Sequence, residues 1–114
     1  MGHWLFRDVD KEGWGFLRPL PAFPTKPNQK LCLMKKVSES QRNYVKIEVV
    51  RAYPTERLYD IVYVSVISYP WTKPTFTRSG EHYISEKKAR EKFQELLREG
   101  YERVSCEDVW HVFL

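Results

Sequence analysis

The sequence contains no apolar run that approaches the roughly 20 residues of a membrane-spanning helix. The richest apolar run, Ile61 to Ile67, has the length of a strand. The first residues hold no apolar stretch of the signal-peptide kind, because charged residues such as Asp8 and Asp10 come too early. These absences argue against a membrane protein and predict that the chain stays in the cytoplasm.

Cysteine is scarce, with only Cys32 and Cys106 in the chain. Two thiols this far apart are not a disulfide framework. We interpret both as small buried apolar side chains, and a single bond between them stays open if their segments lie adjacent. The five glycines are scattered and form neither a phosphate-binding loop nor a nucleotide fingerprint.

Histidine offers no metal site. His3, His82 and His111 stand alone, with no second ligand two or four residues away and no zinc spacing toward a cysteine. We therefore predict no metal, no cofactor and no catalytic residue, and a protein that is not an enzyme. Two chemical alternatives stay open: Cys106 meeting His82 or His111 in space, and a paired acid site at Glu107-Asp108.

The residues that are present favour a folded domain rich in strands. The chain has 114 residues, of which 42% are hydrophobic and 15% aromatic. Such a composition excludes intrinsic disorder, and aromatic residues favour β-structure. We predict one domain over residues 1–114, of the α+β class.

Three segments predict strands, at residues 30–36, 43–52 and 58–68. Residues 43–52 alternate, with Val45, Ile47 and Val49 on one face, as expected for a half-buried strand of an antiparallel sheet. Residues 58–68 are apolar on both faces, which indicates a central strand. A short fourth strand is expected at 75–78 before a turn at Ser79-Gly80, and a last strand or two within 104–113.

One helix is expected over residues 85–99. Ser85 is a suitable N-cap, and Gly100 supplies the left-handed stop. Between them Ala89, Phe93, Leu96 and Leu97 form one apolar stripe. The prediction is a single antiparallel sheet of four to six strands within residues 30–84, one main helix packed on the face of Val45, Ile47 and Val49 or the corresponding face of 58–68, and a C-terminal strand within 101–114.

Residues 1–29 predict an N-terminal hairpin followed by a proline-rich arm. Four prolines between positions 19 and 27 exclude helix and favour an extended, polyproline II conformation. Arg18, Pro21 and Pro24 recur every three residues, a pattern that resembles an SH3-domain ligand. The alternative is a structural strap that buries Leu20 and Phe23, and the sequence leaves both open.

The order of these elements resembles a WGR domain. Residues 43–50, a turn and residues 58–68 are similar to the opening strands of that family, and residues 85–93 are similar to its single helix. The resemblance covers residues 43–103 and implies binding of DNA ends. The Trp-Gly-Arg triplet is absent, because Val64-Ser65-Val66-Ile67 occupies its place, so no contact residue of the family transfers to this chain.

The functional prediction rests on charge. The formal net charge is +4, with eight Lys or Arg against three Glu in residues 25–57 and six against three in residues 70–92. Cations neutralise phosphates and exposed rings stack on bases. We predict a small binding module that contacts the nucleic-acid backbone through basic and aromatic residues of sheet edges and loops: Arg51, Arg57, Tyr69, Trp71, Lys73 and Arg78.

The alternative is a protein–protein interaction module or a small inhibitor, of viral or mobile-element origin. Its basis is the small size, the aromatic richness and the lack of a catalytic motif. The sequence leaves open the oligomeric state and the choice between DNA and RNA.

Overall fold

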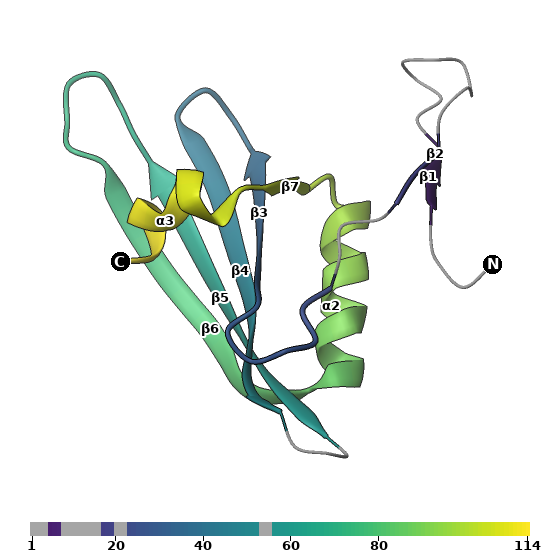
Figure 1. Cartoon of the computed structure of the whole chain (residues 1–114). Helices are drawn as coiled ribbons and strands as arrows, with labels where there is room; N and C mark the ends of the chain where they lie inside the picture. Colours follow the sequence, from purple (N-terminus) through teal and green to yellow (C-terminus); the bar gives the residue numbers. More distant parts are fainter. Residues whose placement is uncertain (1–4, 8–16, 20–22, 53–55) are drawn as a thin grey trace.

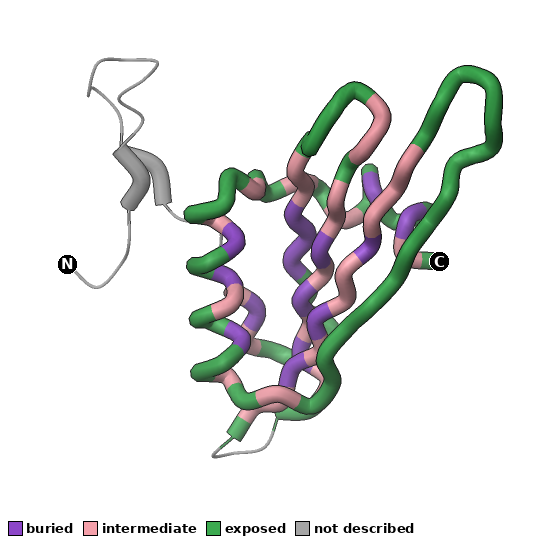
Figure 2. The backbone as a smooth tube through the Cα atoms, turned by 180° about the vertical axis from the view of Figure 1, so that it is seen from behind, coloured by how far each residue is buried: buried purple, intermediate pink, exposed green. Residues whose placement is uncertain are grey.

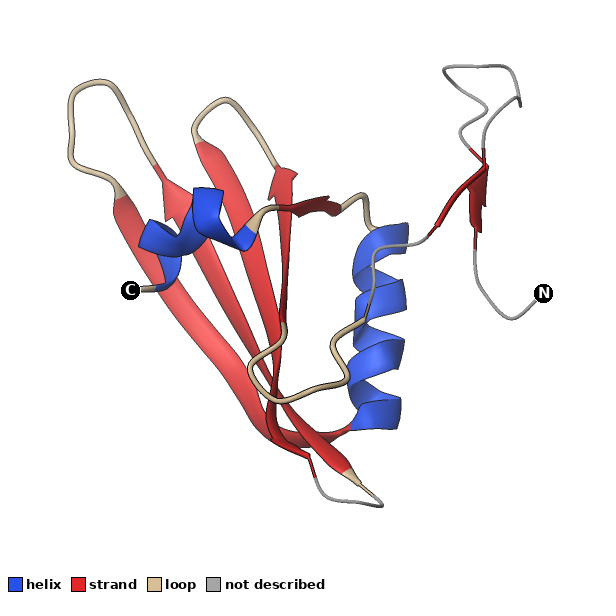
Figure 3. Ribbon diagram, viewed as in Figure 1, coloured by secondary structure: helices blue, strands red, loops and turns tan. Residues whose placement is uncertain are grey.

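The computed structural model describes residues 5–7, 17–19, 23–52 and 56–114. They form an α+β fold, as predicted, in which a five-stranded antiparallel sheet has the order β6-β5-β4-β3-β7 (Figures 1 and 3). Its elements are β3 (Lys30–Lys36), β4 (Gln41–Ala52), β5 (Arg57–Ile67), β6 (Thr75–Ser85), α2 (Glu86–Arg98), β7 (Glu102–Val104) and α3 (Cys106–Phe113).

A separate two-stranded sheet lies at the N-terminal end of the chain. Its strands, β1 (Leu5–Arg7) and β2 (Leu17–Pro19), pair antiparallel as a hairpin. The turn expected between them, at residues 10–13, lies outside the described residues.

The main core lies between the sheet and α2, on what we term the α2 face of the sheet. Val45, Ile47 and Val49 of β4 are buried there against Phe93 and Leu96 of the helix, which confirms the predicted packing. The alternation of β4 is the cause, because its odd-numbered residues all point to this side. Figure 2 shows the buried positions on the middle strands and along the inner side of the helix.

The helix α2 begins and ends as its sequence predicts. The Ser85 side chain accepts a hydrogen bond from the N–H of Lys88, 3.3 Å away, and Glu86 lies in the first turn. Gly100 follows the helix with a φ of 97°, the left-handed conformation that glycine adopts without a steric penalty. Within the described residues no helix has the length and apolar character needed to span a bilayer.

The opposite side of the sheet, the α3 face, is covered by a second helix where the sequence analysis expected a strand. That expectation was wrong, because residues 106–113 form α3 and only β7 is extended. Val109 and Val112 of α3 are buried, and they lie three residues apart, which is a helical spacing. The central strand β5 is therefore covered on both faces, as its two apolar parities predicted, with Ile61 buried on one and Val64 on the other.

The strand β6 is longer than predicted, since it continues from Thr75 to Ser85 through the expected turn at Ser79-Gly80. A Cβ atom on Gly80 would lie 2.8 Å from the carbonyl oxygen of Ile61. The glycine therefore marks a close approach of two strands, which the sequence alone does not distinguish from a turn.

The end of the proline-rich arm is a strap across the core, in agreement with the structural alternative. The ring of Phe23 packs on Tyr59 at 5.2 Å and on Phe93 at 5.5 Å between ring centroids. The Tyr59 hydroxyl donates a 2.7 Å hydrogen bond to the carbonyl oxygen of Pro24, which is buried. Pro24 is thus unavailable to a partner, and Leu20 and Pro21 lie outside the described residues.

Candidate nucleic-acid interface

Two hairpin ends meet beyond the end of α2. They are the β3–β4 turn and the β5–β6 loop, which extend side by side from the sheet in Figure 1. The N–H of Ser68 donates a 2.7 Å hydrogen bond to the carbonyl oxygen of Ser40, which ties the second connection to the first. We define the tip region as residues 34–44 and 65–79.

The tip region carries the entire net charge of the chain. It contains five cations, Lys35, Lys36, Arg42, Lys73 and Arg78, against the single acid Glu39. The rest of the sequence has fourteen Lys or Arg and fourteen Asp or Glu. A positive potential is therefore concentrated at one end of an otherwise balanced molecule, which steers a polyanion to that end.

Two aromatic side chains in the β5–β6 loop stack on each other. The rings of Tyr69 and Trp71 lie 5.2 Å apart with an interplanar angle of 13°, and the N–H of Thr72 closes the turn on the carbonyl oxygen of Tyr69 at 3.2 Å. Trp71 is 77% exposed. An ordered ring with this exposure offers a flat surface on which a base can stack.

Two exposed cations of the tip region lie in the neighbouring β3–β4 hairpin. Lys36 and Arg42 lie opposite each other across the β3–β4 pair, and both are exposed. Glu39 pairs with Lys36 at 3.2 Å, but it is 95% exposed, so water and salt screen the pair strongly. Lys73 extends the basic surface into the aromatic loop, where it is exposed.

A trough crosses the α2 face of the tip region, near Tyr101 that follows α2, and we term it the polar trough after the hydroxyl and amide side chains among its lining residues. Its volume is about 240 Å³. The side chain of Gln41 donates hydrogen bonds to Asn43 Oδ1 at 3.2 Å and Ser65 Oγ at 3.0 Å. The lining offers hydroxyl and amide groups that suit a hydrogen-bonding ligand: Gln41, Asn43, Tyr63, Ser65, Thr77, Ser79 and Tyr101.

The structure divides the six predicted site residues between the tip region, which includes Arg78, and the opposite end of the sheet. Tyr69, Trp71 and Lys73 lie together in the tip region. Arg51 lies toward the opposite end of the sheet, where its guanidinium is 5.7 Å from the ring centroid of Tyr83. The sequence does not reveal this separation. Arg51 lies at the end of β4, and the β5–β6 loop lies at the other end of the sheet, because β5 runs the length of the sheet between them.

Arg57 is a structural residue at the far end of the sheet. Its Nε donates to the carbonyl oxygen of Thr25 and its Nη1 to Glu86 Oε1, both at 2.7 Å. The pKa of Glu86 is lowered, chiefly by the hydrogen bond from Arg90 and further by that from Arg57. Arg57 thus joins the strap to the start of α2.

Arg78 is likewise engaged within the protein. Its guanidinium donates to the carbonyl oxygens of Val112 at 3.0 Å, of Phe113 at 3.2 Å and of Leu114. Cations at a helix C-terminus satisfy carbonyl groups that have no partner inside the helix. Arg78 contributes charge to the tip region, but its donors are directed at α3.

Lys36 and Arg42 were missed by the sequence analysis. The signal for them is the tight turn between two predicted strands, which places residues 36 and 42 opposite each other. The register of a hairpin places side by side two charged residues that are six positions apart in the sequence.

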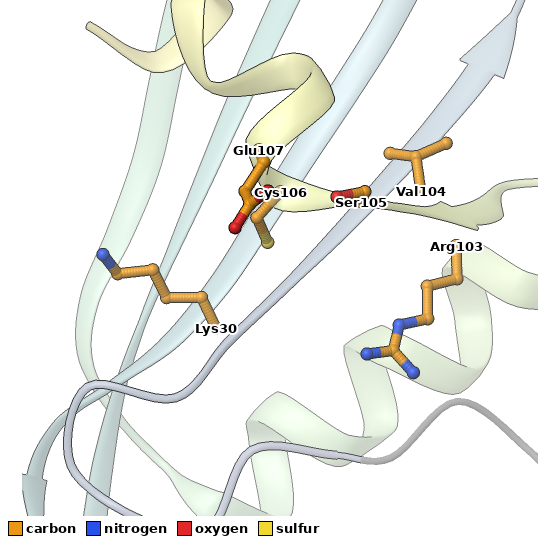
Figure 4. A pocket seen from close by; sticks show the side chains of 6 residues that line it. All are labelled: Lys30, Arg103, Val104, Ser105, Cys106 and Glu107. Carbon is orange, nitrogen blue, oxygen red and sulfur yellow. The ribbon is translucent and has the colours of Figure 1, made fainter.

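A larger hollow lies at the β7–α3 junction, outside the tip region. It encloses about 500 Å³ and is lined by Lys30, Arg103, Val104, Ser105, Cys106 and Glu107 (Figure 4). The Cys106 thiol neighbours that of Cys32, and burial together with this neighbour raises the pKa of Cys32. The two segments are adjacent, since β7 pairs with β3, but both cysteines are free thiols and form no disulfide bond.

His82 contacts an acid instead of a cysteine. Its Nδ1 lies 3.1 Å from Asp60 Oδ2, while Asp60 Oδ1 accepts the N–H of Tyr83 at 3.1 Å. Tyr83 has a φ of 55° and sits where the β5–β6 register shifts. Asp60 therefore holds an irregularity in the strand. Among the described residues no three His, Cys, Asp or Glu side chains are grouped to hold a metal ion.

Comparisons with known proteins find no match among protein-family models, curated proteins or solved structures. The WGR-like order of elements in residues 43–103 stays a prediction from the sequence.

Proposed function

We propose that this protein is a non-catalytic module that binds nucleic acid through its tip region, in the cytoplasm. The observation that carries the proposal is the concentration of the whole +4 formal charge beside an exposed, stacked pair of rings. The WGR-like element order points to the same class of ligand.

The tip region offers two kinds of contact. Lys36, Arg42 and Lys73 are exposed cations that neutralise backbone phosphates without reading sequence. Trp71, supported from behind by Tyr69, stacks on an unpaired base. Because stacking requires an accessible base face, single strands are the preferred form.

The polar trough supports the same choice. It lies on the α2 face of the sheet, where the ammonium group of Lys35 is 5.9 Å from the ring centroid of Tyr101, one of its lining residues. Lys36 and Arg42 point to the opposite face. The trough offers hydroxyl and amide groups at the sheet surface. An unpaired base has free hydrogen-bonding edges that match such groups, whereas a duplex hides them. Arg51, Arg57 and Arg78 have no direct ligand contact in this proposal, since they lie elsewhere or are engaged within the fold.

The test is a fluorescence anisotropy titration with labelled single-stranded DNA and RNA of about 12 nucleotides, within the range of known site sizes, and with the matching duplex. We expect single strands to bind more tightly, with log K falling against log salt with a slope of about −2 for three neutralised phosphates. Lys73→Gln should reduce that slope by roughly 0.7. Trp71→Ala should weaken binding about 5- to 150-fold.

The matched control is Lys87→Gln, which removes an exposed cation from α2, outside the tip region. It should leave affinity and salt slope almost unchanged. Binding that is absent at low salt, or an equal loss for Lys87→Gln and Lys73→Gln, would contradict the proposal.

A further inference from the structure

The strand β6 forms a long and open edge of the sheet. It has 11 residues, and all of them except Ile84 are exposed (Figure 2). At the opposite edge, β7 has only 3 residues. Within the described part of the chain no strand pairs with the outer side of β6. An open edge of this length is a template for another strand.

The backbone groups that face outward can be derived from the ladder. The N–H of Ser68 bonds to the carbonyl of Ser40, one step beyond the pair Gln41–Ile67. The direction of the backbone N–H and C=O groups alternates along a strand. The odd-numbered residues of β5 from Ile61 to Ile67 therefore direct these groups to β6. Their partners on β6 are Thr75, Thr77 and Ser79. Phe76, Arg78 and Gly80 therefore direct their backbone groups outward.

We propose that this edge pairs with the same edge of a second copy of the chain, antiparallel and about a two-fold axis at Thr77. A symmetric antiparallel pair requires one residue to lie opposite itself. With Thr77 in that place, Phe76 of each copy faces Arg78 of the other. Both residues have outward N–H and C=O groups, so the pairing forms two hydrogen bonds at each of these two positions.

The side chains in this register are complementary. Phe76 meets Arg78 on the α3 face, Thr77 meets Thr77 on the α2 face, and Thr75 meets Ser79 beside it. Beyond this pair the ladder ends, because β6 begins at Thr75 and the preceding residue, Pro74, has no N–H to donate to Gly80. Cross-strand hydroxyl pairs and cation–ring pairs stabilise antiparallel neighbours.

Neighbouring registers are less favourable. An axis at Arg78 places two guanidinium groups opposite each other, which is destabilising. An axis at Phe76 limits the pairing to residues 75–77, because β6 begins at Thr75, whereas the axis at Thr77 pairs residues 75–79. An axis at Ser79 extends the pairing to His82, next to the irregular backbone of Tyr83 at φ 55°. The segment itself thus selects both the partner and the register.

The pairing joins two polar troughs. Asn43, Ser65 and Thr77 lie in one row across β4, β5 and β6 of the α2 face. At the axis this row continues into the same row of the second copy. The result is one continuous row of polar side chains across a ten-stranded sheet. The self-association does not depend on nucleic acid and is measured without it.

Sedimentation velocity of the full chain over a concentration series tests the proposal. The weight-average mass should rise with concentration from 13.7 kDa toward twice that value. Thr77→Lys should hold the chain as a monomer, since it places two ammonium groups face to face at the axis, and Thr77→Glu should do the same with two carboxylates. An equimolar mixture of the two variants should restore the dimer.

The matched control is Thr75→Lys, an exposed position on the same strand and face that meets Ser79 instead of itself. It should weaken the dimer far less than Thr77→Lys does. Circular dichroism confirms that each variant is folded. A chain that stays monomeric at every concentration, a dimer that persists in Thr77→Lys, or a mixture that fails to associate overturns the proposal.

Discussion

At the scale of single residues, the absence of a Cβ atom at Gly80 allows β6 to pair closely with β5. The Cβ of any other residue would lie 2.8 Å from the Ile61 carbonyl oxygen, a backbone atom that cannot move away alone. Gly80 lies opposite Val62 in the middle of the β5–β6 ladder. The residue that suggested a turn is therefore the one that lets two strands approach.

Gly80→Ala should consequently destabilise the protein, although alanine has the better intrinsic conformational entropy. We expect a loss of about 1–3 kcal/mol in the free energy of unfolding, because β6 must move away from β5. Urea denaturation measures the effect. Ser79→Ala, at the exposed neighbour, is the control and should change stability by less than about 0.5 kcal/mol. Equal stability of the two variants would show that the strands adjust without cost.

At the scale of elements, the sequence predicts the helices and strands whose hydrophobic pattern is long enough to fit only one periodicity. The strand β3 has the predicted bounds, β4 and β5 differ by one or two residues, and α2 lies between the predicted cap and stop. The final helix was missed because Val109, His111 and Phe113 also alternate as a strand does. In eight residues the two periods overlap, and only tertiary contacts decide between them.

Those contacts are visible around α3. Lys30 and Lys46 place their ammonium groups 4.4 and 5.2 Å from the centroid of the Trp110 ring. The carbonyl oxygens at the C-terminal end of the helix accept hydrogen bonds from the guanidinium group of Arg78 in β6. A short helix is marginal without such support, so its formation depends on strands that are distant in sequence.

Arg78→Gln should loosen α3 while leaving the rest of the sheet intact. The loss of the charged donor at the helix C-terminus is worth about 0.3–2 kcal/mol. We expect faster amide hydrogen exchange in residues 109–114 and unchanged exchange in β4. Arg98→Gln, in the last turn of α2, is the control and should leave α3 protected. Unchanged exchange in α3 would mean that its buried valines hold it without Arg78.

At the scale of the whole molecule, the candidate site could be predicted only in part. Tyr69, Trp71 and Lys73 are adjacent in sequence, so they stay together in the structure. Arg57 and Arg78 were chosen for their charge, but the fold directs them to Glu86 and to α3. Pairing across the sheet, which brings Lys36 to Arg42, depends on register. Composition reveals the charge of the tip region, and only topology reveals its position.

The balance between burial and charge also sets how the whole fold responds to pH. Burial is the main cause of the raised pKa values of Cys32, Tyr59 and Tyr63. Their ordinary values are 9.0 for the thiol and 10.0 for the phenols. The unfolded chain releases these protons above about pH 9, whereas the folded chain retains them, so stability is complete below that pH and falls as pH rises. Glu86, whose pKa is lowered from 4.5, acts in the opposite direction. Its contribution is present above pH 4.5 and is lost as pH falls below it.

We therefore expect the free energy of unfolding to decline on the alkaline side by up to about 1.4 kcal/mol per pH unit for each of the three groups. Urea denaturation at a series of pH values from neutral to alkaline measures the slope. Tyr63→Phe should make the decline shallower, because it removes a half-buried phenol that donates a 3.2 Å hydrogen bond to Glu81 Oε2. Tyr69→Phe is the matched control, since that phenol is exposed on the β5–β6 loop and its loss should leave the slope as it was. If both variants follow the unmodified chain at every pH, the Tyr63 phenol loses its proton as readily in the folded protein as in the unfolded chain.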